Sequence, residues 1–316
     1  MAHDHALPGS LPAQDAAAIT RNVARLSVAT AIVLIGLKLW AWMASGSVAM
    51  LSSLADSGLD GMASLFTLVA VSYAALPPDE EHRYGHGKAE SFAAMVQAVL
   101  VGVSATLVAM EAVARFSDPQ PIAESKLALA VMGISIALTL ALVWAQTRAV
   151  RQTGSVATAG DRAHYAADLA ANGAVIVGIS LAAYSGLQWA DPAVGLLVAG
   201  WLAWSAMDVA RGGWDQLLDH ELPDEARARI RTLALSTGGL LDVHQLRTRA
   251  SGPYVHIQFH ADMPKGITLV DAHQRMVAAE QAIVAEFPSA DVLIHPDPRG
   301  AAEPHGSEPF NEGADE

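Results

Sequence analysis

The sequence predicts an α-helical membrane protein with six transmembrane helices, followed by a small α+β cytoplasmic domain. Of its 316 residues, 52% are hydrophobic and only 16% charged, and the mean hydropathy is +0.31. This composition is too apolar for a soluble protein of that size. Long apolar runs fill the first two thirds of the chain, and shorter alternating segments follow. The chain is therefore expected to be embedded in a bilayer and to carry one soluble domain.

Six apolar runs define the predicted spans, and most approach or exceed the roughly 20 residues that cross a bilayer. They cover residues 26–43, 48–75, 92–114, 127–144, 169–184 and 192–207. An even number of spans places both termini on one side. One set of span ends is flanked by Arg21, Arg25, Arg83, Lys88, Arg148, Arg151, Arg162 and Arg211, and the other set only by Arg115 and Lys126. Because basic residues stay inside, both termini are expected in the cytoplasm of a multi-pass inner (plasma) membrane protein.

The predicted domains follow the changes in composition. We expect a disordered cytoplasmic N-terminus (1–20), a membrane domain (21–210), a linker (211–222), a cytoplasmic domain (223–298) and a disordered acidic tail (299–316). The net charge of −13, which the tail partly supplies, argues against a nucleic-acid partner. The absence of cysteine excludes disulfides and thiolate metal sites, which leaves His, Asp and Glu as strong ligands.

The cytoplasmic domain is predicted to have the order αββαβ. Its helices are expected at 224–235 and 269–287, and its strands at 240–248, 254–261 and 291–295. In the second strand, Val255, Ile257 and Phe259 alternate with polar residues, as in a half-buried strand. His256 is assigned to the solvent-exposed face. A core this small would gain from a partner subunit.

Two pairs of ionisable residues carry the main functional signal. Asp56 and Asp60 lie four residues apart in the second run, and His164 and Asp168 repeat that spacing at the fifth. Residues four apart lie on one face of a helix. Charged residues deep in a membrane are costly and usually functional, although structural polar contacts between spans are an alternative. Two such helices side by side would offer four N and O ligands, a set that fits Zn²⁺, with Cd²⁺, Fe²⁺, Co²⁺ or Mn²⁺ as competitors.

The depths of the two pairs predict an unusual start for the fifth helix. Asp168 lies six residues beyond Arg162, whereas Asp60 lies far from the cytoplasmic end of its own run. At about 1.5 Å per residue, helices that begin where hydropathy suggests would separate the pairs by roughly 10 Å or more. We therefore expect the fifth helix to begin near Val156, with polar first turns enclosed by protein.

Further candidate ligands lie outside the spans. Asp79, His82 and His86 follow one another closely in the loop after the second span. Such a set can bind zinc, although a cytoplasmic loop is also polar for ordinary reasons. In the cytoplasmic domain the candidates are His244, His260, His273, His295 and Asp297, which fall on or near four different elements.

Three motifs make the chain recognisable. Leu-Ala-Asp-Ser-Gly-Leu-Asp at 54–60, His-Tyr-Ala-Ala-Asp at 164–168 and His-Arg-Tyr-Gly-His-Gly-Lys-Ala-Glu at 82–90 resemble the cation diffusion facilitator family. The similarity runs from about residue 22 to 298 and is closest to the bacterial ferrous-iron and zinc efflux branch. It implies a homodimeric metal/proton antiporter that transports metal at Asp56, Asp60, His164 and Asp168.

The same resemblance implies roles for the other residues. The loop set (Asp79, His82, His86) would be a modulatory metal site. His244, His260, His295 and Asp297, with weaker support for His273, resemble a binuclear zinc site in which Asp297 could bridge two ions. Lys88 and Asp219 resemble a charge pair at the dimer junction.

Proton exchange is expected on physical grounds as well. Ligands must be deprotonated to bind metal, so metal entry expels protons. His164 is predicted to carry one of them, because an unperturbed imidazole titrates near physiological pH. An intramembrane metalloenzyme is disfavoured, because the chain has no HExxH motif and four protein ligands leave no open position for water. A membrane metal sensor without transport remains an alternative to a zinc-exporting antiporter.

Overall fold

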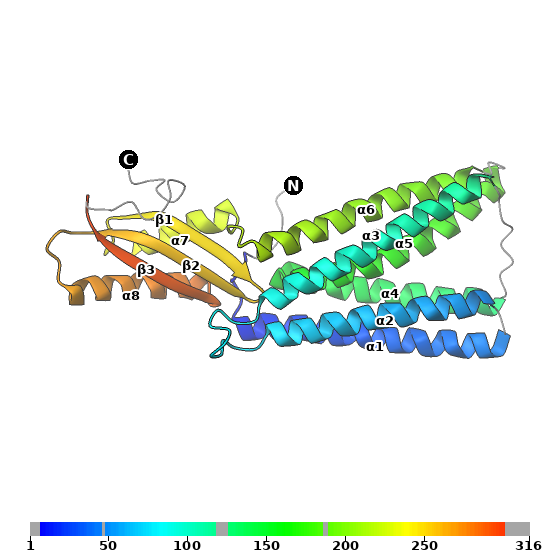
Figure 1. Ribbon diagram of the computed structural model, residues 1–316, viewed down its shortest axis with the longest axis horizontal. Helices are drawn as coiled ribbons and strands as arrows, with labels where there is room; N and C mark the ends of the chain where they lie inside the picture. Colours follow the sequence, from blue (N-terminus) through cyan, green and yellow to red (C-terminus); the bar gives the residue numbers. More distant parts are fainter. Residues whose placement is uncertain (1–6, 46–47, 118–125, 186–188, 301–316) are drawn as a thin grey trace.

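The computed structural model describes residues 7–45, 48–117, 126–185 and 189–300. It comprises a bundle of long helices with a small α+β domain attached at one end (Figure 1). The bundle helices are α1 (Ala13–Ser45), α2 (Val48–Ala74), α3 (Lys88–Ser117), α4 (Lys126–Thr153), α5 (Val156–Ser185) and α6 (Ala190–Leu217).

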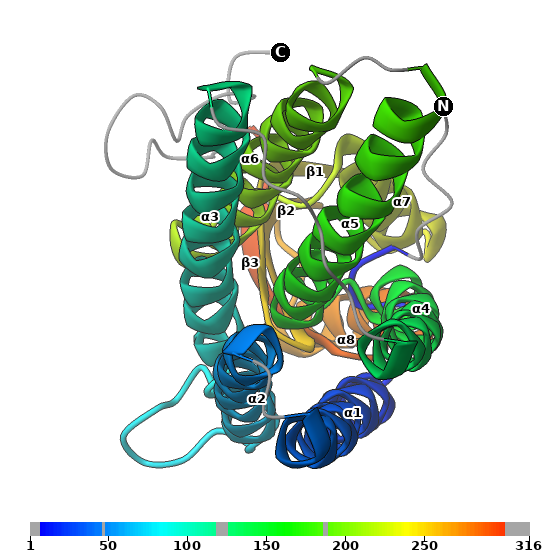
Figure 2. The same cartoon turned by 90° about the vertical axis from the view of Figure 1, so that its right-hand side faces the viewer.

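The bundle has two sides that α5 joins. Helices α1, α2 and α4 lie together, and α3, α5 and α6 form the other side (Figure 2). Among the described residues, five helices are long and apolar enough to span a membrane, namely α1, α2, α3, α4 and α6. The first half of α5 is interrupted by Asp161, Arg162, His164 and Asp168. This polar half is enclosed by protein, since α5 packs against α3, α4 and α6.

The predicted early start of α5 at Val156 is confirmed. Ser155 immediately precedes the helix, and its hydroxyl oxygen accepts a hydrogen bond from the backbone N–H of Thr158 at 3.3 Å, as expected of an N-cap. Ser155 also donates a hydrogen bond to the buried carboxyl group of Glu90 in the first turn of α3. This carboxyl group interacts with the backbone N–H of Ala157 as well. The start of α5 is therefore fastened to α3.

Two predicted boundaries are wrong. The disorder expected for 1–20 does not hold for the described part, because α1 begins at Ala13 and Leu7 packs against the cytoplasmic core. The linker does not begin at 211, since α6 continues to Leu217. Hydropathy falls at 211 because the helix becomes more polar there, while the helix itself continues. Residues 1–6 of the N-terminus and 301–316 of the acidic tail lie outside the described residues.

The cytoplasmic domain has the predicted αββαβ order. Its elements are α7 (Asp224–Ser236), β1 (Asp242–Ser251), β2 (Tyr254–Met263), α8 (Leu269–Glu286) and β3 (Ala290–Pro298). The sheet order is β1-β2-β3, with β1 antiparallel and β3 parallel to β2. One face of β2 is buried against the helices through Val255, Ile257 and Phe259. The opposite face carries the alternating polar side chains.

The assignment of His256 to the solvent-exposed face is wrong. His256 does point away from the core residues of β2, but only 7% of it is exposed. Tyr84, from the loop between α2 and α3, stacks edge-on against its ring with centroids 5.7 Å apart. Asp291 on the neighbouring strand lies 3.4 Å from its Nδ1. Strand periodicity identified the face correctly, whereas a distant loop covers this end of it.

The α2–α3 loop approaches the β1–β2 turn so closely that a side chain at Gly87 would not fit. A Cβ at Gly87 would lie 2.0 Å from the backbone oxygen of Ser251, and the facing Gly252 has φ +56°. The membrane domain and the cytoplasmic domain therefore meet backbone to backbone here.

We expect Gly87→Ala to lower the unfolding free energy by about 1–3 kcal/mol, because the methyl group overpacks this contact. Thermal denaturation of the purified protein measures the effect. Gly102→Ala in α3, where no described residue lies within 4 Å of the added Cβ, is the matched control and should be neutral or slightly stabilising. Equal behaviour of the two variants would contradict the close contact.

Candidate metal centres

The first candidate centre lies between α2 and α5, within the helix bundle. Nε2 of His164 is 3.0 Å from Oδ1 of Asp60. Ligand atoms of Asp60, His164 and Asp168 all lie within 4.8 Å of one another. The His164 side chain is 8% exposed and that of Asp60 is 19% exposed, so the site is enclosed but not sealed. Three of the four predicted ligands are thus close enough to share one small cation.

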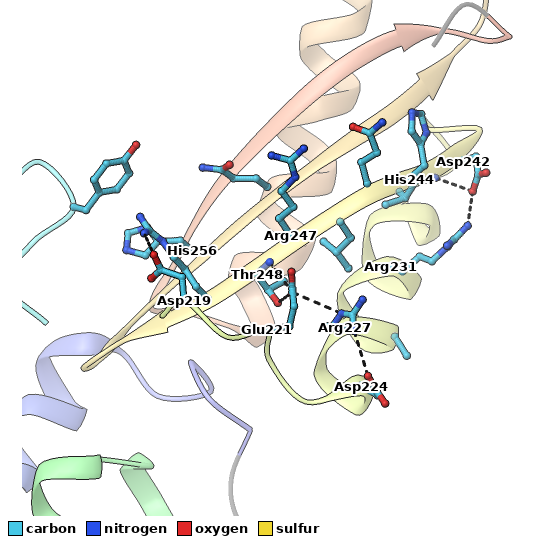
Figure 3. A pocket seen from close by; sticks show the side chains of 17 residues that line it. Asp219, Glu221, Asp224, Arg227, Arg231, Asp242, His244, Arg247, Thr248 and His256 are labelled. Atoms are coloured by element: carbon cyan, nitrogen blue, oxygen red, sulfur yellow. Dashed lines mark hydrogen bonds and ion pairs between the residues drawn. The ribbon is translucent and has the colours of Figure 1, made fainter. Parts of the chain in front are cut away.

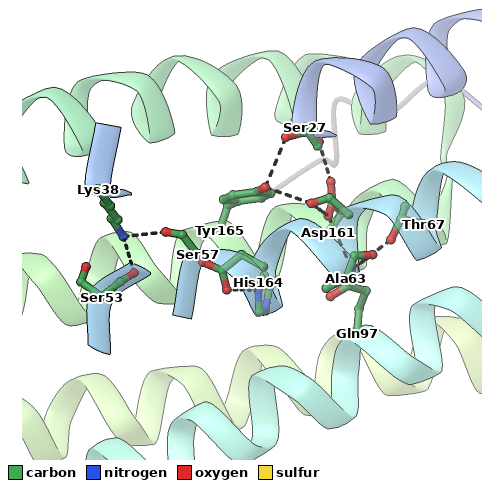
Figure 4. A network of polar contacts seen from close by, with 12 residues as sticks. Ser27, Lys38, Ser53, Ser57, Ala63, Thr67, Gln97, Asp161, His164 and Tyr165 are labelled. Carbon is green, nitrogen blue, oxygen red and sulfur yellow. Dashed lines mark hydrogen bonds and ion pairs between the residues drawn. The ribbon is translucent and has the colours of Figure 1, made fainter. Parts of the chain in front are cut away.

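Asp56 is not part of this group. It lies one turn from Asp60 on α2 and is exposed. Lys38 of α1 approaches the same region, where its ammonium group donates hydrogen bonds to Ser57 Oγ at 2.6 Å and to the Ser53 carbonyl at 3.2 Å (Figure 4). It interacts electrostatically with the carboxylates of Asp60, Asp168 and Asp56. Sequence reasoning overlooked Lys38, although a lone lysine within an apolar run is a recognisable signal.

The second candidate centre is the loop after α2. Asp79 reaches His82 Nδ1 with one oxygen and His86 Nε2 with the other, each at 3.2 Å. The backbone N–H of His82 donates to Asp79 and lowers the pKa of that carboxyl group below its usual range. His86 is buried, and its Nδ1 has no hydrogen-bond partner in the described part of the chain. The loop therefore presents a deprotonated carboxylate between two imidazoles.

The third candidate centre follows from the strand register. His244 pairs with His260 across β1 and β2, and His260 pairs with His295 across β2 and β3. The three histidines therefore form a row across the sheet, on the face opposite the helices. Asp297 follows His295 by two residues and so points to the same side. Residues far apart in the sequence meet because of this pairing.

Asp297 contacts all three histidines of this row. Its Oδ2 lies 2.9 Å from His260 Nδ1 and 3.3 Å from His244 Nε2, and its Oδ1 lies 3.4 Å from His295 Nε2. The two carboxylate oxygens thus face different imidazoles, as a bridging ligand would. His273 is exposed on α8 and lies outside the group of His244, His260 and Asp297 that could hold one ion.

A charged cluster joins the bundle to the cytoplasmic domain. Lys88 Nζ lies 3.1 Å from Asp219 Oδ1, and Asp219 Oδ2 accepts a hydrogen bond of 3.1 Å from Arg249. The Arg249 guanidinium stacks over the Tyr84 ring, 4.7 Å from its centroid. Asp219 and His256 lie at one end of an open polar pocket along β1 (Figure 3). The sequence indicated Lys88 and Asp219 but gave no sign of Arg249 or Tyr84.

Comparison with known proteins agrees with this architecture. Residues 24–218 match the family described as the cation efflux transmembrane domain, and 222–299 match the cation efflux protein, cytoplasmic domain. The cation-efflux pump FieF of Shewanella oneidensis is 40% identical over 274 residues, which cover 87% of this chain and 92% of that protein. FieF of Klebsiella pneumoniae is 40% identical over 276 residues, covering 87% and 91%. FieF of Cronobacter sakazakii is 38% identical over 281 residues, covering 88% and 93%.

His256 is expected to contribute to the pH dependence of the protein's stability. Burial and the nearby Arg249 lower the pKa of His256, while Asp291 and Asp219 oppose the shift. The folded state therefore favours the neutral ring. The contribution of the neutral His256 ring to the free energy of unfolding is complete above about pH 6.5, the pKa of a histidine in the unfolded chain. This contribution is lost as the pH falls through the lower pKa that His256 has in the folded protein.

We expect the denaturation temperature of the wild type to fall more steeply between pH 7.5 and pH 5 than that of His256→Gln, measured without added metal. His220→Gln, which changes an exposed histidine after α6, is the control and should follow the wild type. Parallel curves for the wild type and His256→Gln would contradict this assignment.

Proposed function

The chain belongs to the cation efflux family, the cation diffusion facilitators of the iron and zinc branch, and on that premise we propose that it exports Zn²⁺ in exchange for protons. It is a multi-pass membrane transporter and not an enzyme. In this proposal a homodimer in the inner membrane, with both termini in the cytoplasm, binds Zn²⁺ at the α2–α5 site. It then releases the ion on the opposite side by alternating access.

The observation that carries the proposal is the convergence of Asp60, His164 and Asp168 on one point inside the helix bundle. Two carboxylates and an imidazole suit Zn²⁺, which is commonly four-coordinate and tetrahedral. Asp56, one turn along the same helix, is the predicted fourth ligand in this proposal.

Charge balance supports exchange with protons. Asp56, Asp60 and Asp168 supply up to three negative charges, and Lys38 supplies one positive charge nearby. A divalent cation neutralises the remainder, so the metal-free site needs protons to reach the same balance. His164 contacts Asp60 directly and is the group that we expect to take up one of these protons.

The other two centres are proposed to bind regulatory zinc. The loop site would comprise Asp79, His82 and His86. The cytoplasmic site would comprise His244, His260, His295 and Asp297, with Asp297 between two ions. Zinc there would tighten the homodimer, and the Lys88–Asp219 contact would link this change to the bundle. His273 stays a weaker candidate, because it lies apart from the others in one chain.

The main alternatives are an exporter of Fe²⁺, Cd²⁺, Co²⁺ or Mn²⁺, or a membrane metal sensor without transport. The same N and O ligands serve all these ions, and availability often decides between them. Flux of each metal under a pH gradient separates these possibilities from zinc export.

We expect Asp60→Ala to abolish Zn²⁺ uptake into proteoliposomes driven by a pH gradient, because it removes a carboxylate from the site. Glu111→Gln, which changes an exposed acid that pairs with Arg115 on α3, is the control and should transport normally. Absence of flux in the wild type, or equal flux in Asp60→Ala, would defeat the transporter proposal.

Replacement of His164 is expected to weaken the coupling to protons. In His164→Ala, any residual Zn²⁺ flux should depend less on pH between about pH 6 and 8, where an imidazole titrates. The measurement is flux at several internal pH values. Full pH-dependent exchange in this variant would show that His164 is not a proton carrier.

Removal of the Asp297 carboxylate should abolish zinc-dependent tightening of the dimer. Asp297→Asn keeps the shape of the side chain but replaces one ligand oxygen of the proposed bridge. Chemical cross-linking with and without Zn²⁺ reports the effect. Asp291→Asn, on the same strand but outside the metal group, should respond to Zn²⁺ like the wild type. A zinc response retained in Asp297→Asn would argue against the site.

A further inference from the structure

A buried carboxylate outside the candidate metal centres lies where five helices of the bundle meet. Asp161 of α5 is only 1% exposed. It accepts a hydrogen bond from Ser27 of α1 at 2.6 Å (Figure 4). Two further hydrogen bonds come from Ser64 of α2 at 3.2 Å and Gln146 of α4 at 2.8 Å. Gln97 of α3 approaches it at 3.5 Å. One side chain of α5 therefore contacts four of the five other bundle helices.

All four donors around Asp161 are uncharged. An ionised carboxylate can accept about four hydrogen bonds, so this set can saturate it without a cation. A buried acceptor that loses its donors is costly, because no water replaces them. Ser27, Ser64, Gln97 and Gln146 are themselves fully buried. Separation of these helices at this level would therefore be unfavourable.

Asp161 is aligned with the metal ligands on α5. His164 and Asp168 follow it by three and seven residues, a spacing that places all three on one face of a helix. On α2, Ser64 follows Asp60 by four residues, which is also one turn along one face. The two helices thus make two cross-contacts one turn apart: Asp60 with His164, and Ser64 with Asp161.

Two contacts restrict the relative position of α2 and α5 more than one contact does. A single contact still allows two helices to rotate and slide about that point, whereas a second contact one turn away restricts both movements. Tyr165 adds to the second contact, since its hydroxyl group lies 2.9 Å from Ser64 Oγ and donates to the Ser27 carbonyl at 3.4 Å. The Asp161 contacts thereby restrain the depth and rotation of α5 beside Asp60.

We propose that Asp161 is a positioning residue for the transport site, which holds α5 so that His164 and Asp168 meet Asp60. The inference rests on the proposed function, because it takes these three residues as the metal ligands. Asp161 itself does not contact the metal in this proposal. Asp161 acts by holding α5 at a fixed height and rotation relative to α2.

The test measures Zn²⁺ binding to the full-length purified protein. The transport-site component is the part of the binding that is lost in Asp60→Ala. Asp161→Ala should raise the dissociation constant of this component about 10- to 100-fold, as loss of a group that orients a metal ligand commonly does. Thr20→Ala, which removes a buried hydrogen bond within α1 alone, is the control and should bind like the wild type.

Asp161→Asn distinguishes a role of Asp161 in positioning α5 from an effect of its negative charge on metal binding. In the described part of the chain, Gln97 Oε1 and Gln146 Oε1 are buried without hydrogen-bond partners. After rotation of an amide group, the carboxamide that this change introduces could donate to one of them and keep the helices joined. Affinity close to the wild type in Asp161→Asn, with weak binding in Asp161→Ala, supports a positioning role. Equally weak binding in both variants, or no loss in either, overturns it.

Single-donor variants keep the proposal testable if Asp161→Ala does not fold. Ser64→Ala removes the donor on α2, the helix that carries Asp60, whereas Ser27→Ala removes a donor on α1. The first should weaken binding more than the second, and the reverse order would contradict the proposal. Absence of any Asp60-dependent binding in the wild type would remove the proposed function together with this inference. Unchanged binding in Asp161→Ala would remove the inference alone.

Discussion

The structure depends on hydrogen-bond and ion-pair partners for the ionisable side chains that lie inside the helix bundle. Asp60, His164 and Asp168 lie close enough together to share a cation, whereas Asp161 is surrounded by neutral donors. An isolated charge in such a place costs several kcal/mol, so each group requires partners on a neighbouring helix. The packing of α5 against α2 follows from this requirement. Helix packing and the proposed metal binding therefore depend on neighbouring buried polar groups of the same two helices.

The contact between the two domains follows a different principle. The α2–α3 loop carries the Asp79, His82 and His86 cluster and continues through Tyr84 to Gly87, which touches Ser251 of the cytoplasmic domain. Tyr84 covers both His256 and Arg249, and Arg249 shares Asp219 with Lys88. A candidate metal site, an aromatic contact and a charge cluster thus lie along one short stretch of chain. This arrangement gives the proposed regulatory metal a direct structural route to the bundle.

Helix and strand order could be read from the sequence because both depend on local pattern. The six apolar runs and the αββαβ order reflect hydropathy and periodicity, and the early start of α5 followed from the depth of Asp168. The burial of His256 could not be predicted in this way, because a loop far earlier in the chain covers it. The end of α6 was also misplaced, since a helix that becomes polar keeps its backbone hydrogen bonds.

By itself, the sequence determined the chemistry that is available: a cysteine-free set of carboxylates and imidazoles, two of its pairs at helical spacing within apolar segments. Only the tertiary structure decided which of these groups meet. It joined Asp60 to His164 while leaving Asp56 aside, and strand register aligned His244, His260 and His295. It also placed Lys38 and Asp161 beside the candidate ligands. The physical reason is that ligand types are a property of residues, whereas coordination depends on distances between elements that only packing sets.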